Sequence, residues 1–178
     1  MGTRPDCLPP DVLELLSELN KIKPIWIELG LQTIHERSAA YIRRGYELSV
    51  YDEAVNQLRA RQIETITHVI LGLPGESRDD MVNTVRYVGN SGVQGIKLQL
   101  LHVLKGTDLA DDYLAGLFSC MEMDEYVNLI CDCLRILPKD MVIHRMTGDA
   151  PKKDLIAPKW STDKKRVLNA LHTAIRLL

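Results

Sequence analysis

Polar side chains interrupt four segments that otherwise have the composition of buried strands. Strands of a parallel sheet covered on both faces are nearly all apolar. An unpaired charge is costly in such a place, so each of these groups must meet a partner, a ligand or water. Their carboxylate, amide, imidazole and ammonium groups could therefore hydrogen-bond a ligand. The residues are Glu28 and Gln32, His68, Lys97 and Gln99, and His144 with Arg145.

Two arrangements would accommodate these residues. In an open sheet each would lie near a strand end and be satisfied locally, which is the simpler explanation for any single residue. In a barrel or half-barrel they would line a wet concave cavity, and the same anomaly in four strands favours this arrangement. The candidates for substrate contact are then Glu28, Lys97, Gln99, His102, Lys105 and His144, with the loop from Thr147 to Trp160.

Three histidines, His68, His102 and His144, fall one per strand, and such a set could bind a divalent metal. His68 lies in the middle of its strand whereas His102 lies at the end of its strand, so the two side chains need not be at the same level of the sheet. Hydrogen bonding is the expected role, and no metal site is predicted.

The cysteines are spaced unlike metal ligands. Cys131 and Cys133 are two apart in a helical segment, where side chains point in different directions. The chain has no C-x2-C pair and no three-cysteine cluster motif. Buried structural thiols are expected for Cys7, Cys120, Cys131 and Cys133, and a metal or redox role is the alternative.

The elements that must position these residues alternate along the chain. The stretch Thr67–Glu76 sets the pattern: an apolar run ends at a Gly-x-Pro-Gly turn, and Ser77 opens an amphipathic segment. The alternation predicts an α/β protein with a parallel sheet and right-handed crossovers, in a single domain over residues 1–178. Strands are expected at 25–32, 64–71, 96–102 and 141–146, and helices at 10–19, 35–44, 49–61, 79–90, 108–116, 123–137 and 161–178.

Composition narrows the class of protein. Of the 178 residues 46% are hydrophobic and the formal net charge is −2, which is typical of a soluble globular protein. There is no signal peptide and no apolar run of about 18 residues, so no membrane span is expected. The cysteine content is consistent with a reducing cytosol, and a cytoplasmic location is expected.

Five motifs in this order resemble the radical S-adenosylmethionine (SAM) superfamily, and more closely a bacterial subfamily similar to the elongator catalytic subunit. They are Trp26–Thr33, Ile42–Gly45, His68–Glu76, Gly95–Thr107 and Ile143–Pro151. The resemblance covers essentially the whole chain. It implies an α/β fold that is the C-terminal part of a (β/α)6 partial TIM barrel, with mainly parallel strands and outer helices.

The resemblance also implies a function. Members hold a [4Fe–4S] cluster with a C-x3-C-x2-C loop, and the cluster with SAM yields a 5′-deoxyadenosyl radical. This chain lacks that motif and begins where the family's third strand ends. It is therefore expected to be a fragment of an iron–sulfur oxidoreductase that helps to bind SAM and substrate, without a cluster or activity of its own. The alternatives are a non-catalytic binding or assembly module, and an unrelated half-barrel with hydrolase or aldolase chemistry, for which no G-x-S-x-G motif is present.

Cofactor positions carry over from the family by motif. Gln32 matches a glutamine that contacts the ribose or methionine part of SAM, and Arg44 matches an arginine that pairs with its carboxylate. His68 stands where several relatives have an aspartate for the ribose hydroxyls. The turn whose backbone lies against adenine corresponds to Gly72, Leu73, Pro74 and Gly75.

The expected partners follow from the same resemblance. The strand 25–32 should pair in an intact barrel with a preceding strand, of which only residues 2–4 remain, so a homodimer through this exposed edge is predicted. An RNA substrate is suggested by family analogy, although the net charge of −2 does not support a nucleic-acid surface.

Overall fold

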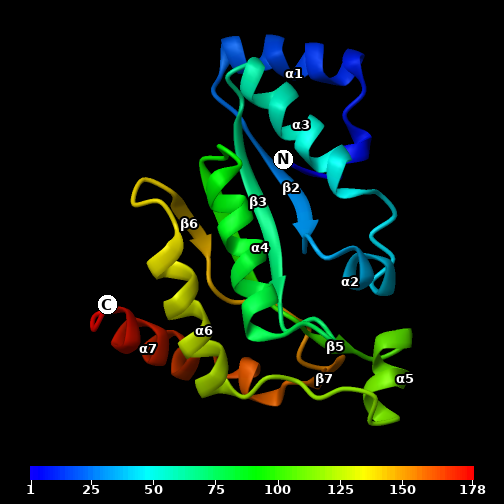
Figure 1. Ribbon diagram of the computed structural model, residues 1–178, viewed down its shortest axis with the longest axis vertical. Helices are drawn as coiled ribbons and strands as arrows, with labels where there is room; N and C mark the ends of the chain where they lie inside the picture. The colour runs from blue at the N-terminus through cyan, green and yellow to red at the C-terminus, as the bar shows by residue number, and fades with distance from the viewer.

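A five-stranded sheet in the order β1-β2-β3-β4-β6 runs through the computed structural model, which describes all 178 residues (Figure 1). Every neighbouring pair in it is parallel, which confirms the predicted α/β class with a parallel sheet. The strands are β1 (Gly2–Thr3), β2 (Trp26–Gln32), β3 (Glu64–Leu71), β4 (Gly95–Leu100) and β6 (Val142–Arg145).

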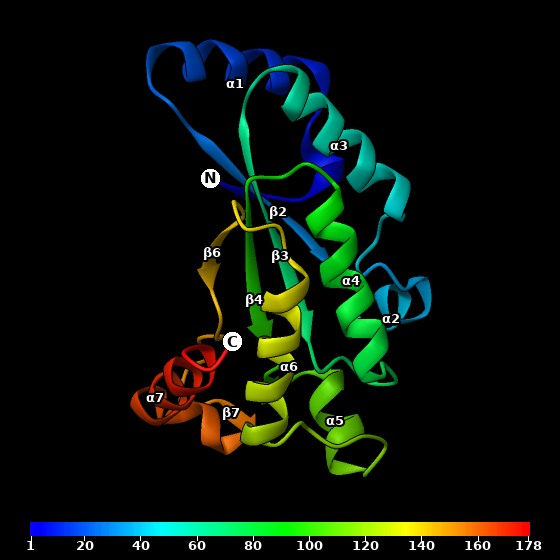
Figure 2. The same cartoon turned by 60° about the vertical axis from the view of Figure 1, so that its left-hand side comes forward.

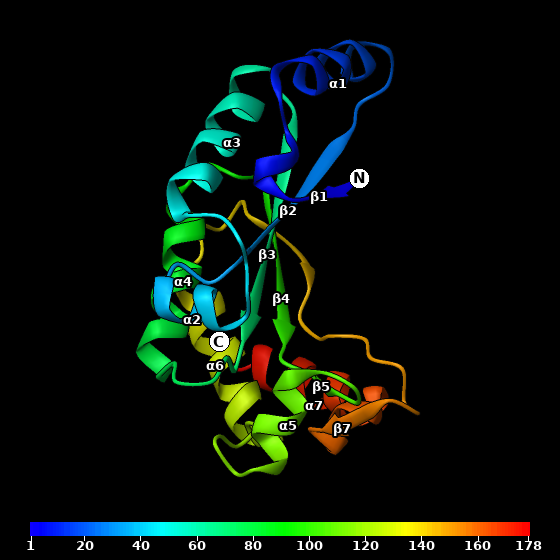
Figure 3. The same ribbon diagram turned by 90° about the vertical axis from the view of Figure 1, so that its right-hand side faces the viewer.

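Helices cover one face of this sheet. Figures 2 and 3 show α3, α4 and α6 packed along that face, whereas no helix runs beside β2 and β3 on the opposite face. We call this opposite side of β2, β3 and β4 the open face. The helices are α1 (Pro10–Ile22), α2 (Glu36–Tyr41), α3 (Leu48–Ala60), α4 (Arg78–Asn90), α5 (Asp108–Leu114), α6 (Met123–Ile136) and α7 (Lys164–Ile175), with 3-10 turns η1 (Pro5–Cys7) and η2 (Lys159–Thr162).

The helix α4 shows how local sequence sets an element's boundaries. The Ser77 hydroxyl accepts a hydrogen bond from the Asp80 backbone N–H, and the Asp80 carboxylate accepts one from the Ser77 N–H. This capping box satisfies two of the backbone donors that a helix start leaves free. At the other end Gly92 has a φ of +82°, a conformation that glycine adopts without steric cost.

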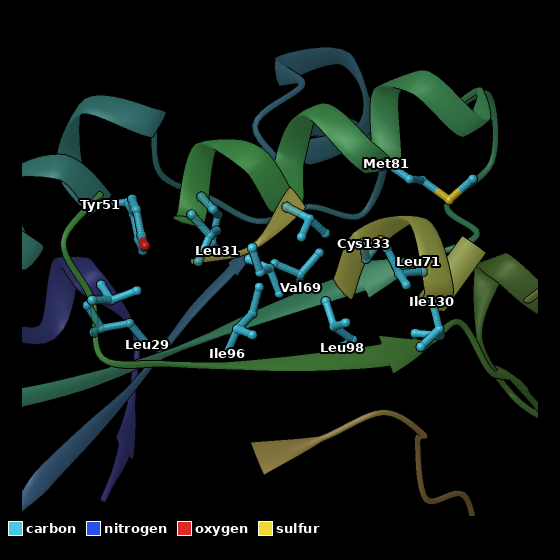
Figure 4. Packing of buried hydrophobic residues seen from close by; sticks show 14 of the residues in the cluster. Leu29, Leu31, Tyr51, Val69, Leu71, Met81, Ile96, Leu98, Ile130 and Cys133 are labelled. Carbon is cyan, nitrogen blue, oxygen red and sulfur yellow. The ribbon is translucent and has the colours of Figure 1, made fainter. Parts of the chain in front are cut away.

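The core lies between the sheet and the covering helices. Alternate residues of the strands point at the helices and are almost completely buried, as Figure 4 shows for Leu29, Val69 and Leu98. They pack with Ile130 and Cys133 of α6 in one cluster. Burial of each such aliphatic side chain contributes roughly 1.5–3 kcal/mol to the stability of the fold, so this layer determines which side of the sheet faces the helices.

The predicted boundaries are wrong in the last third of the chain. The stretch 147–160, expected to be a loop, contains β7 (Leu155–Ala157), which pairs antiparallel with β5 (Val103–Leu104). The strand expected over 96–102 accordingly ends at Leu100, and β5 follows it. Strands of two or three residues are too short to show alternation in the sequence.

The helix α1 buries only a narrow apolar stripe. Leu13 and Leu16 are buried, whereas Leu15 and Leu19 are 55% and 44% exposed. The helix lies at the amino ends of the strands and is covered on one side only (Figure 3). β1 pairs with just Glu28 and Leu29 of β2, and the homodimer through this edge stays a prediction.

No helix is both long enough and apolar enough to cross a membrane.

Candidate functional site

The polar strand residues of three neighbouring strands meet on the open face. In the register of the sheet Gly30 of β2 lies opposite His68 of β3, and His68 lies opposite Lys97 of β4. Glu28 and Gln99 occupy the adjoining rows of the same face. Because side chains alternate along a strand, all of these point away from the helix-covered core. The sheet therefore gathers residues that are spread along the chain from Glu28 to Gln99 into one polar surface.

A chain of hydrogen bonds joins four of these side chains. Lys97 Nζ donates to Glu28 Oε2 over 2.6 Å, and His68 Nε2 lies 2.9 Å from the same oxygen. Gln99 Nε2 lies 3.2 Å from His68 Nδ1. Since the amide nitrogen can only donate, Nδ1 accepts, and the neutral imidazole carries its hydrogen on Nε2 and donates it to Glu28. The network thus specifies one tautomer of His68.

The charges in this network are set by their neighbours. The hydrogen bond from Lys97, assisted by that from His68, lowers the pKa of Glu28 to about 2. Burial, reinforced by the positive charge of Lys97, lowers the pKa of His68 despite the opposing effect of Glu28. At neutral pH Glu28 is therefore ionised and His68 is neutral, and the arrangement holds one partly buried ion pair beside an imidazole that can hydrogen-bond.

Replacing Glu28 with glutamine should remove one source of pH-dependent stability. The folded-state pKa of about 2 lies below the ordinary value of 4.5, so the contribution is complete above pH 4.5 and is lost as the pH falls toward 2. The stability difference between the parent and Glu28→Gln, measured by urea unfolding, should therefore shrink between pH 6 and pH 3. Glu18→Gln, which removes an exposed carboxylate of α1, is the control and should show no such trend. A pH-independent difference for Glu28→Gln would contradict the assignment.

The other substrate candidates form no hydrogen bond with this network. His102 Nε2 is 3.1 Å from Ser161 Oγ, and Lys105 donates to the carbonyl of Lys153. His144 lies over Gly95 at the amino end of β4, where a Cβ would approach its ring to 2.7 Å. The structure therefore brings together Glu28, Lys97 and Gln99 with His68, leaves His144 one row from Lys97 on the same face, and places His102 and Lys105 elsewhere.

Gln32 ends β2 in an unusual conformation. Its φ is +65°, in the left-handed region, and the pairing of β2 with β3 shifts register between Gly30 and Gln32. The side chain folds back over Gly30, where a Cβ would overlap the Gln32 amide nitrogen. Such backbone strain in a non-glycine residue is often found where a side chain has to be held in a particular place. Gln32 thus extends the polar surface toward the carboxyl end of β2.

Arg44 is committed to contacts within the protein. Its side chain is 1% exposed, and its Nε and Nη1 donate to the carbonyls of Tyr46 and Thr33, each over 2.8 Å. Its Nη2 donates to Glu36 Oε1 over 2.9 Å. The structure therefore places Arg44 as a clamp on the segment that follows β2, and its expected contact with a cofactor carboxylate stays a prediction.

The turn after β3 is joined to the same segment by Glu76, which the sequence analysis did not single out. Its Oε1 accepts a 2.6 Å hydrogen bond from the hydroxyl of Thr33, and its Oε2 is buried without a hydrogen-bond partner. Gly72 and Gly75 have φ values of +91° and +80°, which allow the backbone to turn tightly before α4. The acid directly after the Gly-x-Pro-Gly turn was the signal available in the sequence.

Comparison with known proteins decides the family. The model of the Radical SAM superfamily matches residues 1–88, and that of the Radical_SAM C-terminal domain matches residues 93–176. The chain belongs to the radical SAM superfamily. YtqA of Bacillus subtilis is 48% identical over 172 residues, covering 97% of this chain and 53% of the relative. The chain therefore spans about half the length of this curated relative.

Two solved radical SAM structures share the fold. Elp3 of Methanocaldococcus infernus superposes with a TM-score of 0.76 at 20% identity, over 97% of this chain and 41% of that one. The methyltransferase TsrM of Kitasatospora setae, with cobalamin and a [4Fe–4S] cluster bound, superposes with a TM-score of 0.64 at 11% identity, over 100% of this chain and 44% of that one. These matches show the fold. The resemblance to the elongator subunit is borne out by Elongator complex protein 3 of Schizosaccharomyces pombe, which is 26% identical over 153 residues, covering 84% of this chain and 27% of the relative.

The cysteines of this radical SAM chain do not fit the superfamily's cluster. Cys131 and Cys133 are buried in α6, and burial raises the pKa of Cys133 to about 12, which disfavours the thiolate that binds iron. Cys7 is exposed, which corrects the expectation that all four thiols are buried, and Cys120 is half-buried. No three His, Cys, Asp or Glu side chains converge to hold a metal ion.

Proposed function

We propose that this chain forms the part of a radical SAM enzyme that binds SAM and the substrate. The observation that carries the proposal is the polar open face, which ends at the strained residue Gln32 beside the turn of Gly72 to Gly75. In parallel α/β folds, ligands bind at the carboxyl ends of strands. SAM, reduced at a cluster, supplies a 5′-deoxyadenosyl radical in this superfamily.

Each group of residues has a role in this proposal. The Gln32 amide hydrogen-bonds the ribose or methionine part of SAM, and the glycine turn lets backbone approach the adenine closely. The network of Glu28, His68, Lys97 and Gln99 forms a polar floor with fixed hydrogen-bond donors and acceptors. Its groups hold one another in place, so the donors and acceptors that they leave free can orient a substrate without first reorganising.

The chain by itself would bind SAM but hold no cluster, because its cysteines do not fit one. The alternative, a non-catalytic binding or assembly module, rests on the same mismatch. The two proposals differ in whether the carboxyl end of β2 recognises SAM, and binding can be measured directly.

Titration of the chain with SAM by calorimetry tests the proposal. Gln32→Ala should weaken the affinity about threefold to tenfold, because one neutral hydrogen bond contributes about 0.5–1.5 kcal/mol. Gln57→Ala is the control, since Gln57 is on α3 and bonds only Glu53 and Arg61. Absence of binding by the parent chain, or equal affinity of Gln32→Ala and the parent, would rule out this site.

A further inference from the structure

The conformation of Gln32 holds its side chain in one place. Its backbone is in the left-handed region, and the nitrogen end of its amide lies over Gly30. A free glutamine side chain samples many rotamers, and ordering it costs conformational entropy. Some neighbouring group must offset this cost if the amide is to be ready for a ligand.

Tyr46 is that neighbour. It lies 14 residues after Gln32, in the segment that follows α2, and its hydroxyl donates to the carbonyl of Gly30. The same hydroxyl also donates toward Gln32 Oε1, 3.2 Å away, so its single hydrogen is shared between the two carbonyl oxygens. One phenol thus touches both the strand that carries the amide and the amide itself. Burial raises the pKa of Tyr46, so the hydroxyl keeps its hydrogen at neutral pH.

The ring of Tyr46 is fixed in turn by two arginines. The guanidinium of Arg44 lies 4.9 Å from the ring centroid, and that of Arg4 lies 5.2 Å from it. Arg44 is buried and also bonds the carbonyl of Tyr46, whereas Arg4 comes from the segment between β1 and η1. Cation–π contacts at this distance favour a fixed ring. The hydroxyl is therefore presented from a rigid support rather than from a mobile loop.

We propose that Tyr46 is a positioning residue that holds the Gln32 amide against Gly30, ready to hydrogen-bond a ligand at the carboxyl end of β2. The ligand is SAM under the proposed function, on which this inference rests. Tyr46 acts through Gln32 and does not itself contact the ligand. Its effect on affinity is a preorganisation effect, because the amide need not be ordered when the ligand binds.

Tyr46→Phe tests the proposal with little disturbance, because it keeps the ring that contacts the two arginines and removes only the hydroxyl. In the NMR spectrum of the isotopically labelled chain, the side-chain amide signal of Gln32 is the one that disappears in Gln32→Ala. Tyr46→Phe should shift that signal and weaken SAM binding about fivefold. Tyr87→Phe is the matched control: its hydroxyl donates to Asp52 on the helix-covered side, so it can lower the melting temperature without moving either readout.

A double substitution separates positioning from a general structural effect. In the Gln32→Ala background Tyr46→Phe should cause no further loss of affinity, because the group through which it acts is gone. An equal further loss would overturn the proposal, as would an unshifted Gln32 amide signal in Tyr46→Phe. If the parent chain did not bind SAM, the proposed function would fail, and the amide signal would still decide whether Tyr46 holds Gln32.

Discussion

Replacing Arg44 with methionine is expected to lower the free energy of unfolding by about 3 kcal/mol. Methionine fills a similar volume but cannot donate hydrogen bonds. The buried carbonyl of Thr33 and the partly buried carbonyl of Tyr46 would each lose their arginine donor. A buried acceptor left without a donor costs about 1–3 kcal/mol. Most of the loss thus comes from these carbonyls, since Glu36 is 60% exposed and can be hydrated.

The adjacent residue provides a matched control. Arg43 has a side chain that is 79% exposed and pairs with Asp108, itself 70% exposed. Exposed pairs contribute about 0–1 kcal/mol, so Arg43→Met should reduce stability by less than 1 kcal/mol. Urea unfolding of the parent and both variants gives the comparison. Equal losses for the two variants would show that Arg44 is not a clamp.

The elements of the fold were predictable because their signals are local. The strand Glu64–Leu71 ends at a glycine turn, and Ser77 caps the next helix, so strand, turn and helix all follow from short stretches. The grouping of Glu28, His68 and Lys97 was also foreseeable in outline. Parallel strands in register bring their polar residues to one face. These residues could be identified in the sequence because charged and polar side chains are unusual in strands that are otherwise apolar.

The supports of the site were not predictable, because they depend on contacts between distant segments. Thr33 and Glu76 are 43 residues apart, and no sequence pattern around either residue predicts the hydrogen bond between them. Tyr46 follows a short helix in a segment without periodicity, and Arg44 matched a family position while its packing was unknown. The antiparallel pairing of β5 with β7 was missed for the same reason, since both strands are too short to show alternation.

Replacing Lys97 with methionine is expected to destabilise the chain by about 2–3 kcal/mol, because it leaves the carboxylate of Glu28 with one neutral partner in a largely buried place. The side chains of Lys97 and Glu28 are only 14% and 22% exposed, so water compensates poorly for the lost ammonium. Lys105→Met is the control. Its ammonium is on an exposed loop, and a surface substitution of this kind changes stability by about 0.5 kcal/mol or less.

A second substitution should recover much of the loss. Glu28→Gln in the Lys97→Met background removes the unpaired charge and keeps an oxygen that accepts the hydrogen bond from His68 Nε2. The double variant should therefore be more stable than Lys97→Met alone by about 1–2 kcal/mol, and the cycle gives the coupling between the two residues. If Glu28→Gln lowered stability equally with and without Lys97, the two groups would not act as a pair. The rescue should also fade in acid, because a Glu28 freed from Lys97 can take up a proton and no longer has a charge to bury.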